Sequence, residues 1–313
     1  MALIRKFPLD PGLNFIGQRN IFLAIAALIT VASVAITIVQ GLNFGVDFRG
    51  GLLLEARLAQ PADLGELRNR LGDLGLGDVT LQQFGEPTDV LINLSNSAED
   101  EAGQHAAVEA ITAALGEGTE IRRQEYVGPK VGDELKVDGA LATLLAMLGI
   151  AIYVWFRFEW QFGVAALISL LHDVVATIGF FALTQLEFNL STLAAVLTIA
   201  GYSINDTVVI FDRVREMLRR YKKLELNELL NRAVNTTLSR TLLTSISTLI
   251  ALLALFIFGG EVIRGFTAGL IWGILIGTFS SFGLAVPLLS YLKLRRSSGK
   301  EEAEEARAAE PSA

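Results

Sequence analysis

The sequence predicts an α-helical polytopic membrane protein with six transmembrane helices and a small α+β domain between the first and second of them. Hydrophobic residues make up 52% of the 313 positions and the mean hydropathy is +0.48, which is high for a soluble protein. Six apolar stretches also reach the roughly 20 residues that a helix needs to cross a bilayer core. They lie at 21–40, 137–156, 162–183, 190–211, 241–258 and 266–290.

The first stretch is expected to be a retained anchor that follows a cytoplasmic N-terminus at 1–20. Arg5, Lys6 and Arg19 precede it, as basic residues precede a secretory signal. Its uncharged run is longer than the apolar core of a signal, which spans about 7 to 15 residues. We therefore assign 21–40 to transmembrane helix 1.

The segment 43–133 is expected to fold outside the membrane on the extracytoplasmic side. "GLLLEARL", "DVTLQQFG", "DVLINLS" and "TEIRRQEYV" have strand patterns, while "ADLGELRNRLGDLG" and "GQHAAVEAITAALG" have helical ones. The order is β-α-β-β-α-β, which is typical of a ferredoxin-like domain and does not by itself indicate a function.

Positive charge in the loops predicts that both termini are cytoplasmic. Lys and Arg are retained on the cytoplasmic side of short loops. The short loops on the other side contain only Arg264, whereas fourteen Lys and Arg residues flank the cytoplasmic ends of the six stretches. A basic cytoplasmic loop at 213–238 is expected to be helical, either lying at the lipid headgroups or docking a partner. The polar tail at 291–313 is expected to be disordered.

Two opposite charges fall inside or beside the apolar stretches. Asp206 lies about five residues before the cytoplasmic end of the fourth stretch, and Arg240 lies near the start of the fifth. A charge at the centre of a spanning helix costs about 2.5 to 3.5 kcal/mol, so each should face a partner or water. Antiparallel neighbouring helices would bring the two residues to the same depth.

This pair has two readings that the residues leave open. Burial favours the neutral form of a carboxyl, while a nearby guanidinium favours the charged form. If a conformational change separates the two groups, Asp206 would take up a proton, which makes a proton-coupled switch. The alternative is a permanent ion pair that only orients two helices.

A seam of polar side chains is expected beside this pair. It comprises Ser203, Asn205 and Thr207 on the fourth stretch, Thr244 on the fifth, and His172 and Asp173 on the third. Such a seam could hold a water wire, although hydroxyls in membrane helices often bond only to their own helix or to a neighbour. For His172 and Asp173, a proton relay and a structural polar bond are both open.

The motifs that are missing argue against an enzyme. There is no phosphate-binding G-x-x-x-x-G-K-[ST] sequence, no cysteine and no H-E-x-x-H, so ATP hydrolysis and a metal site are not expected. Ser203 and His172 suggest a serine hydrolase only weakly, because the second glycine of G-x-S-x-G is absent. No cofactor other than protons as the coupling ion is expected, and no nucleic acid partner.

Five stretches resemble the SecF family of protein-export membrane subunits, which is related to proton-driven exporters of the resistance-nodulation-division class. They are "FGVDFRGG" (44–51), "YVWFRFEWQF" (153–162), "LHDV" (171–174), "GYSINDTVVIFDRVRE" (201–216) and "TLSRTLLTS" (237–245). The resemblance implies a six-helix half that pairs with SecD beside the SecYEG channel. There it would draw out a preprotein pushed by the SecA ATPase, using the proton motive force across the cytoplasmic membrane. It also implies that Asp206 and Arg240 form the proton pathway.

Three further groups have expected roles. Asp47, Arg49, Gly50 and Gly51 follow the first helix and are expected to shape a hinge to the outer domain, with a surface turn as the alternative. Asp212 and Arg213 lie at the interface, where they would orient or pack the fourth helix. Glycines recur every four residues at 269, 273 and 277, which indicates close helix packing.

Two other functions share this membrane architecture. One is half of a proton-driven small-molecule exporter, whose outer domain should offer a drug-sized apolar pocket. The other is a passive scaffold for the translocase, for which replacing Asp206 should change nothing.

Overall fold

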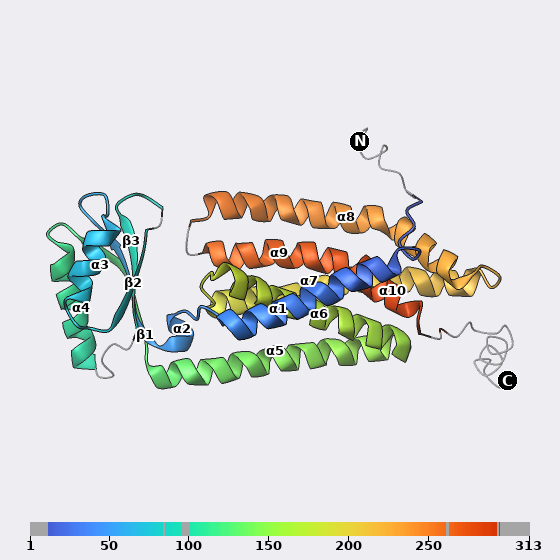
Figure 1. Ribbon diagram of the computed structural model, residues 1–313, viewed down its shortest axis with the longest axis horizontal. Coiled ribbons are helices and arrows are strands. Elements are labelled where there is room, and N and C mark those ends of the chain that lie inside the picture. The colour runs from blue at the N-terminus through green and yellow to red at the C-terminus, as the bar shows by residue number, and fades with distance from the viewer. Residues whose placement is uncertain (1–11, 84, 96–100, 261–262, 293, 295–313) are drawn as a thin grey trace, which may run out of the picture.

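The computed structural model describes residues 12–83, 85–95, 101–260, 263–292 and 294, and consists of a long helix bundle with an α+β domain at one end (Figure 1). Within these residues six helical spans are long and apolar enough to cross a membrane, which confirms the predicted number. They are α1 (Arg19–Gln40), α5 (Pro129–Arg157), α6 (Trp160–Thr184), α7 (Leu190–Arg220), α8 (Leu226–Phe258) and α9 (Arg264–Ser280). A π-helical turn (Ser281–Ala285) and α10 (Val286–Leu289) continue α9.

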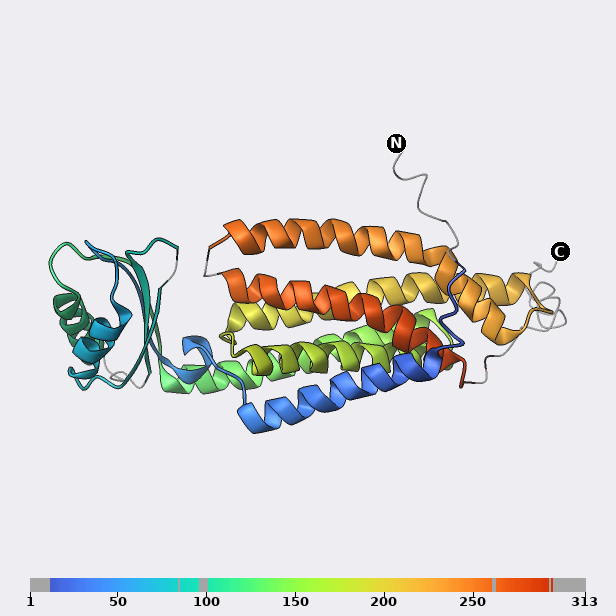
Figure 2. The ribbon, with the colours of Figure 1, turned by 45° about the horizontal axis from the view of Figure 1, so that its top comes forward.

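The first and the last helix of the bundle have their outer termini at the same end. Helix α1 begins, and α10 ends, at the end away from the α+β domain, in both views (Figures 1 and 2). The tail predicted to be disordered (291–313) and the first half of the predicted N-terminal segment (1–11) fall almost wholly outside the described residues.

The basic segment 213–238 is not a separate helix lying across the bundle. Helix α7 continues to Arg220 and α8 already begins at Leu226, so only 221–225 connect them. The segment is helical, as expected, but it extends α7 and α8 and does not form a helix of its own at the lipid headgroups, because the residues after the apolar stretch contain no helix breaker. Arg219 and Arg220 also occupy the last turn of α7, where positive side chains are favourable because the C-terminus of a helix carries partial negative charge.

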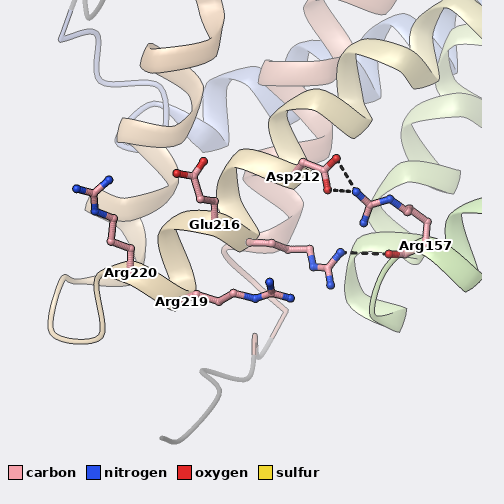
Figure 3. Close-up of a pocket in the computed structure, with 6 residues that line it drawn as sticks. Arg157, Asp212, Glu216, Arg219 and Arg220 are labelled. Carbon is pink, nitrogen blue, oxygen red and sulfur yellow. Dashed lines mark hydrogen bonds and ion pairs between the residues drawn. The ribbon is translucent and has the colours of Figure 1, made fainter. Parts of the chain in front are cut away.

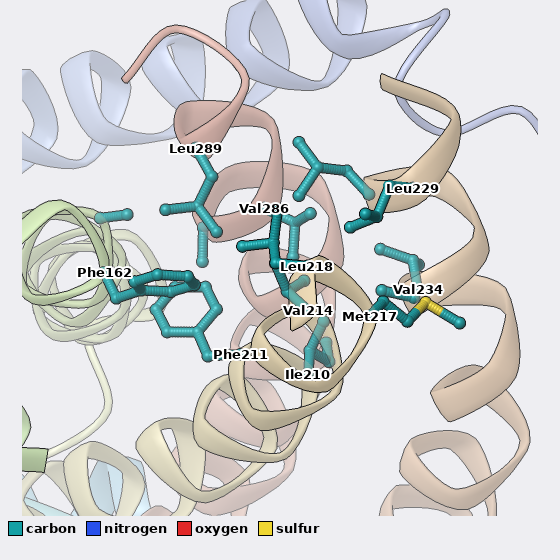
Figure 4. Close-up of a cluster of buried hydrophobic side chains, with 14 of the residues drawn as sticks. Phe162, Ile210, Phe211, Val214, Met217, Leu218, Leu229, Val234, Val286 and Leu289 are labelled. Atoms are coloured by element: carbon teal, nitrogen blue, oxygen red, sulfur yellow. The ribbon is translucent and has the colours of Figure 1, made fainter. Parts of the chain in front are cut away.

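An apolar cluster packs the bundle at the end away from the α+β domain. Phe162 of α6 contacts Phe211 of α7 with ring centroids 5.1 Å apart, and Val286 of α10 and Val234 of α8 lie in the same cluster (Figure 4). Lipid tails are as apolar as these side chains, so close van der Waals packing holds this cluster together where it lies in the membrane.

Three glycines allow α9 to lie directly against its neighbours. A Cβ atom at Gly273 would overlap the side chain of Ile199 in α7, and one at Gly269 would lie 2.7 Å from the ring of Phe181. At Gly277 it would lie 3.0 Å from Cβ of Ser203. These contacts confirm the predicted role of the glycines in close packing.

The α+β domain has the predicted order of elements: β1 (Gly51–Arg57), α3 (Leu64–Gly72), β2 (Asp78–Gln83), β3 (Asp89–Ser95), α4 (Glu101–Leu115) and β4 (Glu120–Val127). The sheet order is β2-β3-β1-β4 with every neighbouring pair antiparallel, which is the ferredoxin-like arrangement. Alternate strand residues such as Leu52, Leu54 and Ile92 are buried beneath α3 and α4. Both helices cover the face away from the bundle, so the other face points toward the membrane helices (Figures 1 and 2).

Candidate functional site: buried carboxyl groups and the junction to the outer domain

Asp206 is buried in the middle part of α7 and one of its oxygens has no partner. The residue is 4% exposed, and among the described residues nothing hydrogen-bonds to Oδ2. A buried polar atom without a partner costs about 1 to 3 kcal/mol, more if it is charged. Such an atom is retained in a fold mainly where it has a function or meets a group that is absent here.

Arg240 lies on α8, the helix that packs against α7. Tyr202 and Arg213 of α7 contact Thr248 and Thr236 of α8 at 3.3 and 3.2 Å, and both charged residues lie between these two contacts. The charge of Arg240 is near enough to act on the Asp206 carboxyl. No ion pair within 4.0 Å joins them in the described chain, and the Arg240 side chain is exposed.

Asp173 is the centre of a hydrogen-bond network that joins three helices. It is fully buried in α6, and its Oδ2 accepts from Ser203 of α7 and from Ser280 of α9, the latter at 2.7 Å. Nδ1 of the buried His172 lies 2.9 Å from Oδ1. An ionised Asp173 can only accept, so this contact then requires the proton on Nδ1 of the histidine. That leaves His172 Nε2 as an acceptor, and it is buried without a partner.

The π-helical turn after α9 lies next to this network. Ser280 immediately precedes the turn, and Ser281 begins it and contacts Thr207 of α7, with 3.1 Å between the hydroxyl oxygens. Single π turns inside α-helices are frequent at functional sites. Of the predicted seam, the structure therefore brings Ser203, His172 and Asp173 into one buried network and places Thr207 beside it.

Other polar groups of the seam face outward. Asn205 is exposed on α7 and its side chain makes no hydrogen bond to the described residues, and Arg240 is exposed on α8. Thr244 donates to the carbonyl of Arg240 in its own helix at 2.9 Å, which is the ordinary bond of a hydroxyl in a membrane helix. Asn205 on α7 and Arg240 on α8 are thus polar groups exposed within the spanning segments.

A second cluster connects the bundle to the α+β domain. Phe44, just after α1, forms a parallel β-bridge with Phe188 in the α6–α7 connection, and Gly45 N donates to Phe188 O at 3.0 Å. Asp47 in the short helix α2 (Val46–Arg49) accepts from the backbone N–H of Leu190, the first residue of α7, at 2.9 Å. A carboxylate is favourable at this position because a helix N-terminus carries partial positive charge.

The glycines of the predicted hinge have conformations that suit this role. Gly50 and Gly51 have φ values of 74° and 136°, a region that residues with a Cβ atom rarely adopt. The first closes α2 and the second opens β1, so the chain turns sharply between the membrane helices and the sheet.

Glu187 is a member of this junction that the sequence did not reveal. It lies between α6 and α7, and a Cβ atom at Gly45 would overlap its carboxyl. Burial raises the pKa of Glu187, as does the negative charge of Asp47, while a hydrogen bond from Asn93 of β3 and the charge of Arg49 act to lower it. Glu187 therefore links the sheet to the membrane helices through Asn93.

The predicted interface residues make surface ion pairs. Asp212 accepts two hydrogen bonds from Arg157 of α5, at 2.7 and 2.8 Å, while Arg213 pairs with Glu216 at 2.6 Å. Both pairs fix side chains near the end of α7. Among the described residues no group of three or more His, Asp or Glu side chains could hold a metal ion.

Comparisons with known proteins decide the family. A model described as the C-terminal part of the protein export membrane proteins SecD and SecF matches residues 107–295, and a model of the SecD/SecF GG motif matches 35–62. The chain belongs to the SecD/SecF family. The second match contains Gly50 and Gly51, and the first contains Asp173, Asp206 and Arg240.

Relatives within this family resemble the chain over almost its whole length. Protein translocase subunit SecF of Rickettsia felis is 43% identical over 94% of this chain and 96% of the relative. The protein of the same name from Pseudomonas aeruginosa is 44% identical over 90% and 92%. As a member of the SecD/SecF family, the chain is a multi-pass membrane subunit of a protein translocase and not an enzyme.

Two solved SecDF structures have the same fold. The crystal structure of SecDF from Thermus thermophilus, a translocon-associated membrane protein, matches with a TM-score of 0.82 and 34% identity over 92% of this chain. A structure of SecDF in a form described as super-membrane-facing matches with a TM-score of 0.68 at the same identity. The chain spans 40% of the length of each SecDF chain.

Proposed function

We propose that the chain works with a SecD partner to couple the proton motive force to preprotein translocation across the cytoplasmic membrane, with both termini in the cytoplasm. The observation that carries the proposal is the buried Asp206 carboxyl, whose Oδ2 has no partner in the described chain while Arg240 lies nearby on the next helix. The unpartnered Oδ2 can take up a proton, or can become a partner of the Arg240 guanidinium if the helices move.

The chemistry is proton uptake and release at Asp206. A guanidinium stays charged at any biological pH, so its approach favours the ionised carboxylate and its withdrawal favours the protonated acid. A movement of α8 relative to α7 would then exchange a proton with one side of the membrane or the other. The charge of one proton crossing 100 mV provides about 2.3 kcal/mol, which shifts a two-state equilibrium by roughly fifty-fold.

The polar residues that α7 and α8 expose support a membrane partner against this face of the bundle. Asn205 and Arg240 would otherwise face lipid, where an arginine costs about 2.5 to 3.5 kcal/mol. A SecD subunit packed against this face would cover both and contribute further groups to the proton pathway. The 40% coverage of the SecDF chains agrees with a partner that supplies the rest. SecYEG, SecA and the preprotein are proposed as partners from the family alone.

The junction gives a route from the proton site to the outer domain. Asp47 holds the first turn of α7, the helix that carries Asp206, and the Phe44–Phe188 bridge ties the chain before β1 to the same connection. A displacement of α7 would therefore reach the sheet through α2. The two SecDF structures give different TM-scores at equal identity, as expected if the parts of this fold can change their arrangement.

The test compares wild type and Asp206→Asn in vesicles that contain the chain with SecD and the channel. Asp206→Asn removes the titratable group at constant size, and we expect it to abolish proton uptake and the stimulation of preprotein export by the proton motive force. Asp138→Asn, which removes an exposed carboxylate from α5, is the matched control and should leave both unchanged.

Three outcomes are informative. Full activity of Asp206→Asn would reject the switch and favour a passive scaffold. Proton uptake that drives export of small molecules and not of preprotein would favour the exporter alternative. Loss of activity in both variants would show that the assay responds to charge in general.

A further inference from the structure

A basic pocket lies at the end of the bundle away from the α+β domain, between the last turns of α7 and the end of α5 (Figure 3). Its volume is about 550 Å³. It is lined by Arg157, Asp212, Arg215, Glu216, Arg219 and Arg220. The proposed proton pathway uses none of these residues.

The two acidic residues of the pocket are already neutralised. Asp212 is held by Arg157 (Figure 3). Glu216 pairs with Arg213, which lies outside the pocket. Arg215 donates to the backbone carbonyl of Arg157 at 3.2 Å and makes no ion pair in the described part of the chain. Arg219 and Arg220 likewise make none there. Three guanidinium groups therefore give the pocket a positive charge that its own acids do not balance.

Large aromatic side chains close to Arg157 in the sequence are exposed. Trp155 and Phe156 at the end of α5 are 62% and 87% exposed, and Trp160 at the start of α6 is 53% exposed. Arg157, which lines the pocket, lies between them in the sequence. Exposed aromatic side chains at the end of membrane helices mark the depth of the lipid headgroups. The pocket is therefore at the level of the phosphates, and the aromatic residues are at the level where acyl chains begin.

We propose that this pocket binds the headgroup phosphate of an anionic phospholipid, whose acyl chains lie against Trp155, Phe156 and Trp160. Guanidinium groups suit phosphate because their N–H groups can bind two of its oxygens at once. Free inorganic phosphate would satisfy the arginines but leave the aromatic surface unused. The combination of charge and apolar surface thus favours a lipid over a soluble anion.

The test measures lipid binding to the purified full chain by native mass spectrometry. The probes are phosphatidylglycerol, phosphatidylcholine of the same acyl chains, and inorganic phosphate as a competitor. The variant is Arg219→Gln with Arg220→Gln, which removes two positive charges from the pocket and leaves the Arg157–Asp212 pair intact. The matched control, Lys222→Gln with Lys223→Gln, removes the same charge from the neighbouring connection outside the pocket.

We expect tighter binding of phosphatidylglycerol than of phosphatidylcholine by wild type. Each basic residue near an anionic lipid surface contributes about 1 kcal/mol, so the pocket variant should bind phosphatidylglycerol roughly 30-fold more weakly. The control should bind it like wild type, and millimolar phosphate should displace little of it.

Two results would overturn the proposal. Equal weakening in both double variants would show that general positive charge and not the pocket attracts the lipid. Complete displacement by inorganic phosphate, with no preference between the two lipids, would assign the pocket to a soluble anion. Arg219→Lys with Arg220→Lys keeps the charge and should retain most of the binding, which separates loss of the site from a failure to fold.

Discussion

Ser280 of α9 donates a hydrogen bond of 2.7 Å to the same oxygen of Asp173 in α6 that Ser203 of α7 also contacts. One carboxyl group thus holds three membrane helices together at a point where the chain excludes water. The network lies on α7 within one turn of Asp206, so it fixes the part of the helix in which the proposed proton acceptor lies.

We expect Asp173→Asn to destabilise the bundle by about 3 kcal/mol. Three groups donate to the two oxygens of the carboxylate. An amide has only one acceptor oxygen and turns an N–H group toward the other donors, which leaves buried polar atoms unpaired. Ser280→Ala should cost only about 1 kcal/mol, since Ser203 still donates to the same oxygen. Thermal unfolding in detergent followed by circular dichroism measures both.

Ser247→Ala is the control for this comparison, because Ser247 is exposed and bonds only to a carbonyl of its own helix, at 2.9 Å. It should unfold like wild type. If Asp173→Asn unfolds at the temperature of this control, the network contributes nothing to stability.

Gly273→Ala should destabilise the contact between α9 and α7. The new methyl group would overlap Ile199, and overpacking of this kind costs about 1 to 3 kcal/mol. Gly149→Ala in α5 has no atom within 4 Å of the new Cβ, so it should be neutral or should stabilise by up to about 1 kcal/mol through helix propensity. Opposite shifts of the unfolding temperature are expected, and equal shifts would contradict the packing role.

The junction should loosen as the pH rises. The raised pKa of Glu187 means that the folded junction binds a proton more tightly than the unfolded chain does. Its stability is therefore greatest below the ordinary glutamate value of 4.5 and falls as the pH rises through the higher pKa of the folded state. Hydrogen exchange at the amides of Gly45 and Phe188, corrected for the intrinsic rates, should show less protection at pH 8 than at pH 5.

Glu187→Gln should remove this pH dependence, since glutamine is neutral at both pH values and can still accept from Asn93. Glu134→Gln, at an exposed position near the start of α5, should keep it. If the protection of wild type is the same at pH 5 and pH 8, the carboxyl of Glu187 does not control the junction.

Replacement of Arg240 should separate charge from geometry in the proposed switch. Arg240→Gln removes the charge and should reduce proton-dependent export as strongly as Asp206→Asn. Arg240→Lys keeps the charge without the planar guanidinium and should retain part of the activity. Export by SecD-containing vesicles, with and without a membrane potential, measures the difference. Full activity of Arg240→Gln would remove this residue from the pathway.

The sequence predicted the spans and the outer domain well because both depend on local patterns. Hydropathy located all six membrane helices, and alternation with turn signals gave the order of the strands. The same measure missed how far α7 and α8 extend, since hydropathy finds only the part that crosses lipid. The helix continues through amphipathic residues as far as Arg220, where nothing apolar marks it.

Site residues were predicted where a charged side chain lies in an apolar stretch, and other site residues were missed. Asp206, Arg240 and Asp173 are costly in an apolar helix and therefore visible. Ser280 was missed because a serine in a membrane helix usually bonds to its own backbone. Glu187 was missed because a charge in a connection is unremarkable until the fold brings Asp47 and Asn93 to it. That Asp206 and Arg240 are not paired in the described chain depends on side-chain conformations, which spacing cannot give.

The π-helical turn at Ser281–Ala285 has a consequence for insertions and deletions. Such a turn accommodates one residue more than an α-helical turn, while the helical segments on either side keep the same side chains turned toward their neighbours. Loss of a single residue from 281–285 would therefore leave an ordinary α-helix, with Gly273 still against Ile199 and Val286 still in its apolar cluster. Loss of a residue anywhere else in this last crossing would rotate one half by about 100° relative to the other.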